Sequence, residues 1–90
     1  MAHLEVDLVA ADRTIWSGEA SMVSAPASEG EVGILPGHTP MLAVLRAGTV
    51  RITPVSGEVV RTDVEAGFIS VDDNRVTVVS DSAVAGSAGR

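Results

Sequence analysis

The sequence predicts an all-β protein, a flattened β-sandwich or barrel of about eight to ten short strands with no helix. Three observations favour this fold class. Valine supplies 15 of the 90 residues, and β-branched side chains fit a pleated strand better than a helix. Nine glycines and four prolines divide the chain at positions typical of turns. Between these breakers, apolar and polar residues alternate with the period of two that marks half-buried strands.

The chain opens with a half-buried strand. Leu4, Val6 and Leu8 alternate with acidic residues, which places the three apolar side chains on one face of an extended segment. Residues 15–24 follow as one long strand. We expect it to be bent or bulged at Ser17–Gly18, because glycine inside a strand pattern marks such an irregularity.

The middle of the chain is rich in glycine and proline, which interrupt regular strands. Residues 25–28 end the long strand with the sequence Ala-Pro-Ala-Ser. Residues 29–40 contain three glycines and two prolines, which predicts a structured loop. An apolar run at residues 41–45 follows this loop.

Alternation returns in the second half. Val50 and Ile52 point inward between polar neighbours. Residues 54–57 form a hairpin connection. The remaining predicted elements are a strand in which Val60, Thr62 and Val64 share a face, a strand at 68–71, a turn at 72–74, and a last strand that includes Val76 and Val78.

These elements predict one β-sandwich domain over residues 1–80 and a flexible tail over residues 81–90. A chain of 90 residues holds a single hydrophobic core. The core is aliphatic, because Trp16 and Phe68 are the only aromatic residues, and we place the Trp16 indole in it. The tail residues are small and polar, so we expect them to fray.

Charge and composition exclude several classes of partner. Twelve acidic residues against six arginines give a net charge of −6, and the arginines are scattered singly among acids, which disfavours nucleic acids and anionic membrane surfaces. No cysteine is present, so disulfides and thiolate chemistry are excluded. The chain has no basic, apolar leader, and no window of about twenty residues is uncharged. We expect a cytoplasmic protein that meets a membrane only through a partner.

Candidates for catalysis or metal binding are few. His38 could be a base, a ligand or a hydrogen-bonding plug, but no nucleophile or spaced set of ligands accompanies it. Glu29 and Glu31 stand two residues apart, so in an extended chain both carboxylates lie on the same side. Such a pair can serve acid–base chemistry or hold a divalent cation, although we favour two solvated charges. His3 is read as a solvated terminal side chain and Asp72–Asp73 as turn residues. We expect no catalytic residue, no metal and no cofactor.

One continuous stretch is too specific for composition to explain. Residues 29–42 read Glu-Gly-Glu-Val-Gly-Ile-Leu-Pro-Gly-His-Thr-Pro-Met-Leu. This string resembles the signature of the epsilon subunit of bacterial F-type ATP synthases, which runs Glu-Gly-Glu, an apolar residue, Gly-Ile, an apolar or aromatic residue, Pro-Gly-His, any residue, Pro-Leu-Leu. The Trp-Ser-Gly step at 16–18 and the Gly-Thr-Val-Arg-Ile step at 48–52 also look like that family. The resemblance covers residues 4 to about 84.

The resemblance implies a non-catalytic subunit of the central stalk, the rotor of the proton-translocating ATP synthase. In that family the β-sandwich links the gamma subunit to the ring of membrane-embedded c subunits and supports the coupling of proton flow to ATP synthesis. Catalysis belongs to the alpha and beta subunits of the same complex. The implied location is the cytoplasmic face of the bacterial cell membrane, where the subunit is peripheral, and no cofactor is implied.

The resemblance also assigns roles to individual residues. Glu31 matches the acidic position that meets the polar loops of the c-ring, and Glu29 is near enough to share this role. His38 matches the signature histidine, which we expect near the same end. Four further residues are expected to shape the loop, the glycines by tolerating positive φ and the prolines by fixing φ: Gly33, Pro36, Gly37 and Pro40.

The chain departs from the family after its last strand. Family members usually carry a two-helix hairpin there, which can inhibit ATP hydrolysis, whereas residues 81–90 lack the length and the apolar period of such helices. We therefore expect no inhibitory arm in this chain. Two other interpretations stay open: a stand-alone β-sandwich module that binds a ligand or peptide at a sheet edge, and a small hydrolase that uses His38 with Glu29 or Glu31.

Overall fold

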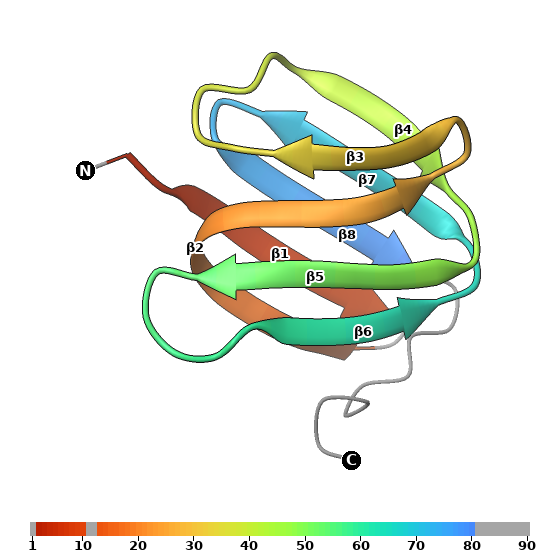
Figure 1. Ribbon diagram of the computed structural model, residues 1–90, viewed down its shortest axis with the longest axis horizontal. Helices are drawn as coiled ribbons and strands as arrows, with labels where there is room; N and C mark the ends of the chain where they lie inside the picture. The colour runs from red at the N-terminus through yellow and green to blue at the C-terminus, as the bar shows by residue number, and fades with distance from the viewer. Residues whose placement is uncertain (1, 11–12, 81–90) are drawn as a thin grey trace.

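A computed structural model describes residues 2–10 and 13–80, which form eight β-strands and contain no helix (Figure 1). Within these ranges there is accordingly no helix with the length and apolar character needed to cross a membrane. The tail expected at residues 81–90 lies outside the described residues. In chain order the strands are β1 (Leu4–Ala10), β2 (Arg13–Ala27), β3 (Gly30–Ile34), β4 (Met41–Leu45), β5 (Gly48–Pro54), β6 (Val60–Val64), β7 (Gly67–Asp72) and β8 (Arg75–Ser80).

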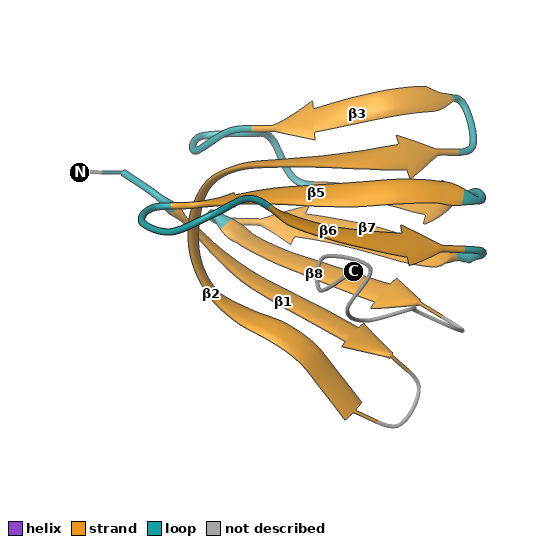
Figure 2. Ribbon diagram, turned by 60° about the horizontal axis from the view of Figure 1, so that its bottom comes forward, coloured by secondary structure: helices purple, strands orange, loops and turns teal. Residues whose placement is uncertain are grey.

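The strands form two layers that share the long strand β2 (Figures 1 and 2). Hydrogen-bonded neighbours run in the order β1-β8-β7-β4-β2-β5-β6, while β3 pairs with β2 and β2 also pairs with β1. The first half of β2 pairs with β1, and its second half lies between β3 and β5. β2 therefore passes from one layer to the other, and the predicted flattened sandwich is confirmed.

The core between the layers is aliphatic, as the composition predicted. The alternating residues of β1, β5, β6 and β8 point inward as expected, and Thr62 is buried among them. Burying each large aliphatic side chain contributes roughly 1.5–3 kcal/mol, so this set holds the layers together. Its largest fully buried apolar members are Leu4, Leu8, Ile34, Ile52, Ile69, Val6, Val23, Val50, Val71, Val76 and Val78.

β2 is the long strand that the sequence predicted, and it is irregular, but the bend or bulge expected at Ser17–Gly18 does not fall there. Gly18 pairs with Val6 in regular register, and the irregularities flank it: Ile15 is the extra residue opposite β1, and Ser21 is the extra residue opposite β5. Gly18 instead leaves space for the indole of Trp16, because a Cβ at position 18 would lie only 3.0 Å from Cη2 of that ring. Trp16 is half-buried against the edge of the core, so its placement inside the core was wrong.

β2 also continues past the point at which the sequence was expected to end it. Pro26 lies inside the strand and pairs with Glu31 of β3. The Pro26 carbonyl oxygen accepts a hydrogen bond from the Arg46 amide at 2.8 Å, on the side away from β3. The proline nitrogen faces that same side, beyond the point where the pairing of β2 with β5 ends at Ser24 and Arg51. A missing N–H at this position costs no ladder bond, which is why proline is tolerated.

Candidate functional site

The signature stretch is a strand between two turns, so the single loop predicted over residues 29–40 is wrong. β3 occupies residues 30–34 and pairs antiparallel with the end of β2, from Ala27 opposite Gly30 to Val23 opposite Ile34. Glycine on the outer face hid the alternation, because Gly33 has no side chain to mark that face. The β2–β3 turn and the β3–β4 loop remain as the two irregular parts.

The two acidic residues of the signature lie in and just after the β2–β3 turn, with Glu29 in the turn and Glu31 at the start of β3. The Ser28 amide donates a hydrogen bond of 2.8 Å to the Val44 carbonyl, which ties the turn to β4. Gly30 has φ +134°, a conformation that favours glycine. Among the described residues, no hydrogen bond or ion pair holds the carboxylate of Glu29 or of Glu31. Both side chains are exposed and free to meet a partner.

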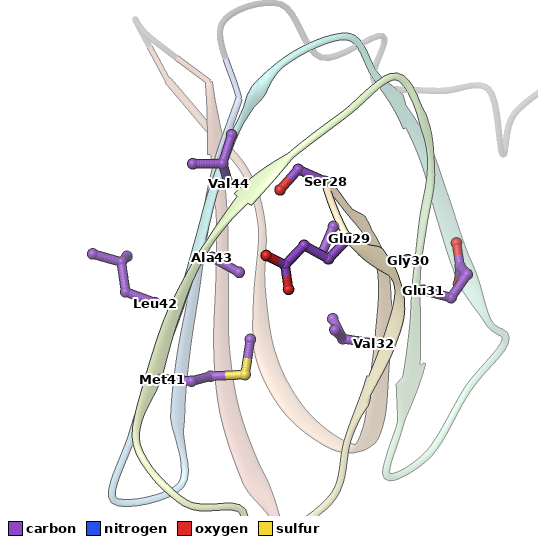
Figure 3. A pocket seen from close by; sticks show the side chains of 10 residues that line it. Ser28, Glu29, Gly30, Glu31, Val32, Met41, Leu42, Ala43 and Val44 are labelled. Atoms are coloured by element: carbon purple, nitrogen blue, oxygen red, sulfur yellow. The ribbon is translucent and has the colours of Figure 1, made fainter.

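The two carboxylates do not share a side, which corrects the expectation drawn from their spacing. Figure 3 shows the Glu29 carboxylate over a hollow between β3 and β4, whereas the Glu31 side chain points away from that hollow. The turn at Ser28–Glu29 and the positive φ of Gly30 break the extended repeat on which the expectation depended. The hollow has a volume of about 490 Å³ and includes Val32 of β3 and Met41 of β4 in its lining.

The β3–β4 loop carries His38 and is fixed by three hydrogen bonds. The His38 amide donates to the Leu35 carbonyl at 3.1 Å, and the Gly37 amide donates to Oδ1 of Asn74 at 2.7 Å. His38 Nδ1 lies 2.7 Å from the Thr39 carbonyl oxygen. A carbonyl oxygen can only accept, so Nδ1 is the donor in this hydrogen bond. No hydrogen bond to Nε2 is formed among the described residues.

Glu29 and His38 lie at opposite ends of the sandwich, which corrects their assignment to one end. Glu29 precedes β3 and His38 follows it, so the whole strand separates them (Figure 1). A hydrolase that pairs His38 with either acid is therefore not formed, because Glu31 also lies near the Glu29 end of β3. The described residues contain no group of three or more His, Cys, Asp or Glu side chains that could hold a metal ion.

The loop-shaping residues fall into two kinds. Gly37 has φ +89°, so it takes a conformation that other residues rarely adopt, as predicted. Gly33 lies within β3 and is not a positive-φ residue, so the conformational role expected for it is wrong. Pro36 begins the turn that contains Gly37, and Pro40 immediately precedes β4.

Sequence reasoning missed an exposed apolar strip on the outer face of β4 and β7. Leu42 is 72% exposed, Val44 62% and Phe68 42%. Val44 and Phe68 are directly opposite each other across the two strands, and with Ala43 and Leu42 they line a shallow hollow of about 300 Å³. The continuous apolar run at residues 41–45 could have predicted this strip. A strand with apolar side chains on both faces is stable in water only when something packs against each face.

Together these features define a class of protein: a β-sandwich whose surface carries an exposed apolar strip and two acidic side chains without a partner among the described residues. Membership in a family agrees with this class. The model of the family described as "ATP synthase, Delta/Epsilon chain, beta-sandwich domain" matches residues 3–86, and the chain belongs to this family. The expectation of a non-catalytic subunit is thereby confirmed, and the family decides against both the stand-alone module and the hydrolase.

Curated relatives agree over nearly the whole chain. The ATP synthase epsilon chain of Micrococcus luteus is 51% identical over 88 residues, which cover 98% of this chain and 97% of the relative. The ATP synthase epsilon chain of Rhodococcus erythropolis is 49% identical over 84 residues, which cover 92% of this chain and 69% of the relative. Relatives therefore differ in how far they extend beyond the matched region.

Solved structures share the fold at lower identity. A chain of the Euglena gracilis mitochondrial ATP synthase, solved with OSCP, F1 and c-ring, matches with a TM-score of 0.86 at 24% identity, covering 93% of this chain and 54% of that chain. A chain of the Tetrahymena thermophila mitochondrial ATP synthase central stalk and c-ring matches with a TM-score of 0.78 at 20% identity, covering 90% and 65%. These likenesses establish the β-sandwich.

Proposed function

We propose that this chain is a central-stalk subunit of a proton-translocating F-type ATP synthase. In this role it links the gamma subunit to the c-ring, turns with them, and supports the coupling of proton flow to ATP synthesis by the alpha and beta subunits. The proposal is supported by relatives that are named ATP synthase epsilon chain. It places the protein peripherally on the cytoplasmic face of a bacterial membrane, held there by the complex.

The exposed apolar strip is the observation that carries this proposal. Leu42, Val44 and Phe68 are exposed in the isolated chain. A partner that covers these side chains removes apolar surface from water, which gives a favourable free energy of binding. We assign this strip to contact with gamma. A close-packed sandwich suits the role, because such a core deforms little under load.

The acidic turn supplies a second contact, directed to the c-ring. Glu31 and Glu29 have no partner among the described residues, so both charges are available to basic side chains of the polar c-ring loops. Exposed ion pairs contribute only about 0–1 kcal/mol each. These acids therefore set orientation and register, while the apolar strip supplies most of the affinity.

Binding to gamma tests the assignment of the strip. Leu42→Asp places a charge on the most exposed apolar residue of the proposed contact, and we expect affinity for the purified gamma subunit to fall by at least about tenfold. Val55→Asp is the matched control, because Val55 is 57% exposed in the β5–β6 connection, away from β4. Equal effects of the two substitutions on affinity, measured by calorimetry, would contradict the assignment.

A further inference from the structure

The turn between β7 and β8 is built from two residues in the left-handed region. Asp73 has φ 52° and Asn74 has φ 62°, the pattern of a two-residue hairpin turn whose twist matches that of the strands. Asparagine tolerates this conformation better than other residues with a Cβ. The backbone conformation explains why asparagine is tolerated here, but it does not explain what the Asn74 side chain does.

Asn74 joins two other parts of the chain to this turn. Its side-chain Oδ1 accepts the hydrogen bond from the Gly37 amide at 2.7 Å, and its carbonyl oxygen accepts one from the Glu5 amide at 2.8 Å. The first bond reaches the β3–β4 loop, 37 residues away in sequence, and the second reaches the start of β1. Three segments therefore meet at a single residue.

The contact with Gly37 matters because the β3–β4 loop pairs with no strand. Residues 35–40 lie outside the strand ladders, and the other two hydrogen bonds given above for this loop, from the His38 amide and from the His38 ring, close within the loop itself. The Asn74 side chain is thus the polar group that holds the loop against the rest of the fold. A shallow hollow of about 430 Å³ lies between the β3–β4 loop and the β7–β8 turn, and His38 and Asn74 are among the residues that line it.

We propose that Asn74 is a positioning residue: its side-chain oxygen fixes the β3–β4 loop and thereby presents the His38 ring, at the end of the sandwich opposite Glu29, to the gamma–c-ring part of the stalk. The claim about presentation rests on the proposed function. The claim about the loop does not, because it follows from the hydrogen bond alone. The two claims therefore have separate tests.

Asn74→Gly tests the hold on the loop. Glycine adopts positive φ freely, so the turn and the fold are retained while the acceptor oxygen is removed. Amide exchange at Gly37, followed by NMR, should become roughly two- to tenfold faster, as expected for the loss of one hydrogen bond. Asn74→Asp is the matched control, because it keeps both the tolerance of positive φ and an Oδ acceptor, and Gly37 should remain protected. Unchanged exchange in Asn74→Gly, with the fold intact, would overturn the inference.

Partner binding tests the presentation of His38. With a purified gamma–c-ring subcomplex as the probe, we expect Asn74→Gly to bind roughly two- to tenfold more weakly than the unmodified chain and Asn74→Asp to bind equally well. Faster Gly37 exchange together with unchanged binding would overturn the positioning role. If the unmodified chain failed to bind this subcomplex, the proposed function would fail, while the exchange measurement would still decide whether Asn74 holds the loop.

Discussion

At the scale of single residues, Trp16 shows how one neighbour decides the position of a large side chain. The indole covers Gly18, where even a Cβ would come within 3.0 Å of the ring. It therefore lies against the edge of the core instead of inside it, and only part of its apolar area is removed from water. Composition predicted an aliphatic core correctly but could not reveal this position, because burial depends on the pairing of β2 with β1.

Trp16→Ala should therefore cost less than the truncation of a fully buried aromatic side chain. Full burial corresponds to about 3–5 kcal/mol, and for the half-buried ring we expect a loss of about 2 kcal/mol in the free energy of unfolding. Urea denaturation followed by circular dichroism measures the loss. A decrease of 4 kcal/mol or more would mean that the indole is buried after all.

The candidate site was predictable in part at this scale. The signature string identified Glu29, Glu31 and His38 as residues to examine, and the structure places all three outside the buried core. Their grouping at one end failed, because the strand character of β3 was hidden by Gly33. Asn74 was missed altogether, since a turn residue shows no sign in sequence of a hydrogen bond to a loop 37 positions away.

At the scale of elements, most strands were predictable, and the strand that was missed is β3, which was expected to be part of a loop. β1 and β5 carry inward apolar residues at every second position, and β6 and β8 do so except for one buried polar residue each, which in β6 is Thr62, so the faces of these four strands were assigned correctly. β3 is five residues long with two glycines, and its pairing partner, the end of β2, contains a proline. The glycines of β3 and the proline near the end of β2 suggested that neither segment was a strand. The two segments pair with each other in the folded protein, and this pairing outweighs their low intrinsic preference for strand.

The start of β7 provides a sharp test of element packing. Gly67 has φ +149°, and a Cβ there would collide with the Val79 carbonyl oxygen of β8. Gly67→Ala should cost roughly 3–5 kcal/mol, because the β7–β8 ladder must shift. Gly57→Ala is the matched control: Gly57 has φ +105° with no atom within 4 Å of the added Cβ, so backbone strain alone should cost about 1–2 kcal/mol.

Thermal and urea denaturation of the two variants distinguish these effects. Gly67→Ala should be clearly less stable than Gly57→Ala. Equal stabilities would show that β7 and β8 separate easily at this point, contrary to their close approach in the structure.

At the scale of the whole molecule, the three proposed contact surfaces lie on different parts of the sandwich. The β2–β3 turn lies at one end and the β3–β4 loop, which carries His38, at the other (Figure 1). The apolar strip lies on the exposed face of β4 and β7. Such separation allows one rigid body to touch different partners at once without interference between the contacts. This separation agrees with the proposed role of a link between the gamma subunit and the c-ring.

The coupling of proton flow to ATP turnover tests this account most directly. Membrane vesicles that carry an ATP synthase depleted of its epsilon subunit should regain ATP-driven proton pumping when the unmodified chain is added. Glu31→Arg should restore pumping and cross-linking to the c-ring less well while its stability is nearly unchanged, because an exposed charge contributes little to folding. Glu58→Arg, the same change of charge at an exposed residue of the β5–β6 connection, should restore both as well as the unmodified chain. Full pumping and cross-linking with Glu31→Arg, or no recovery with the unmodified chain, would contradict the account.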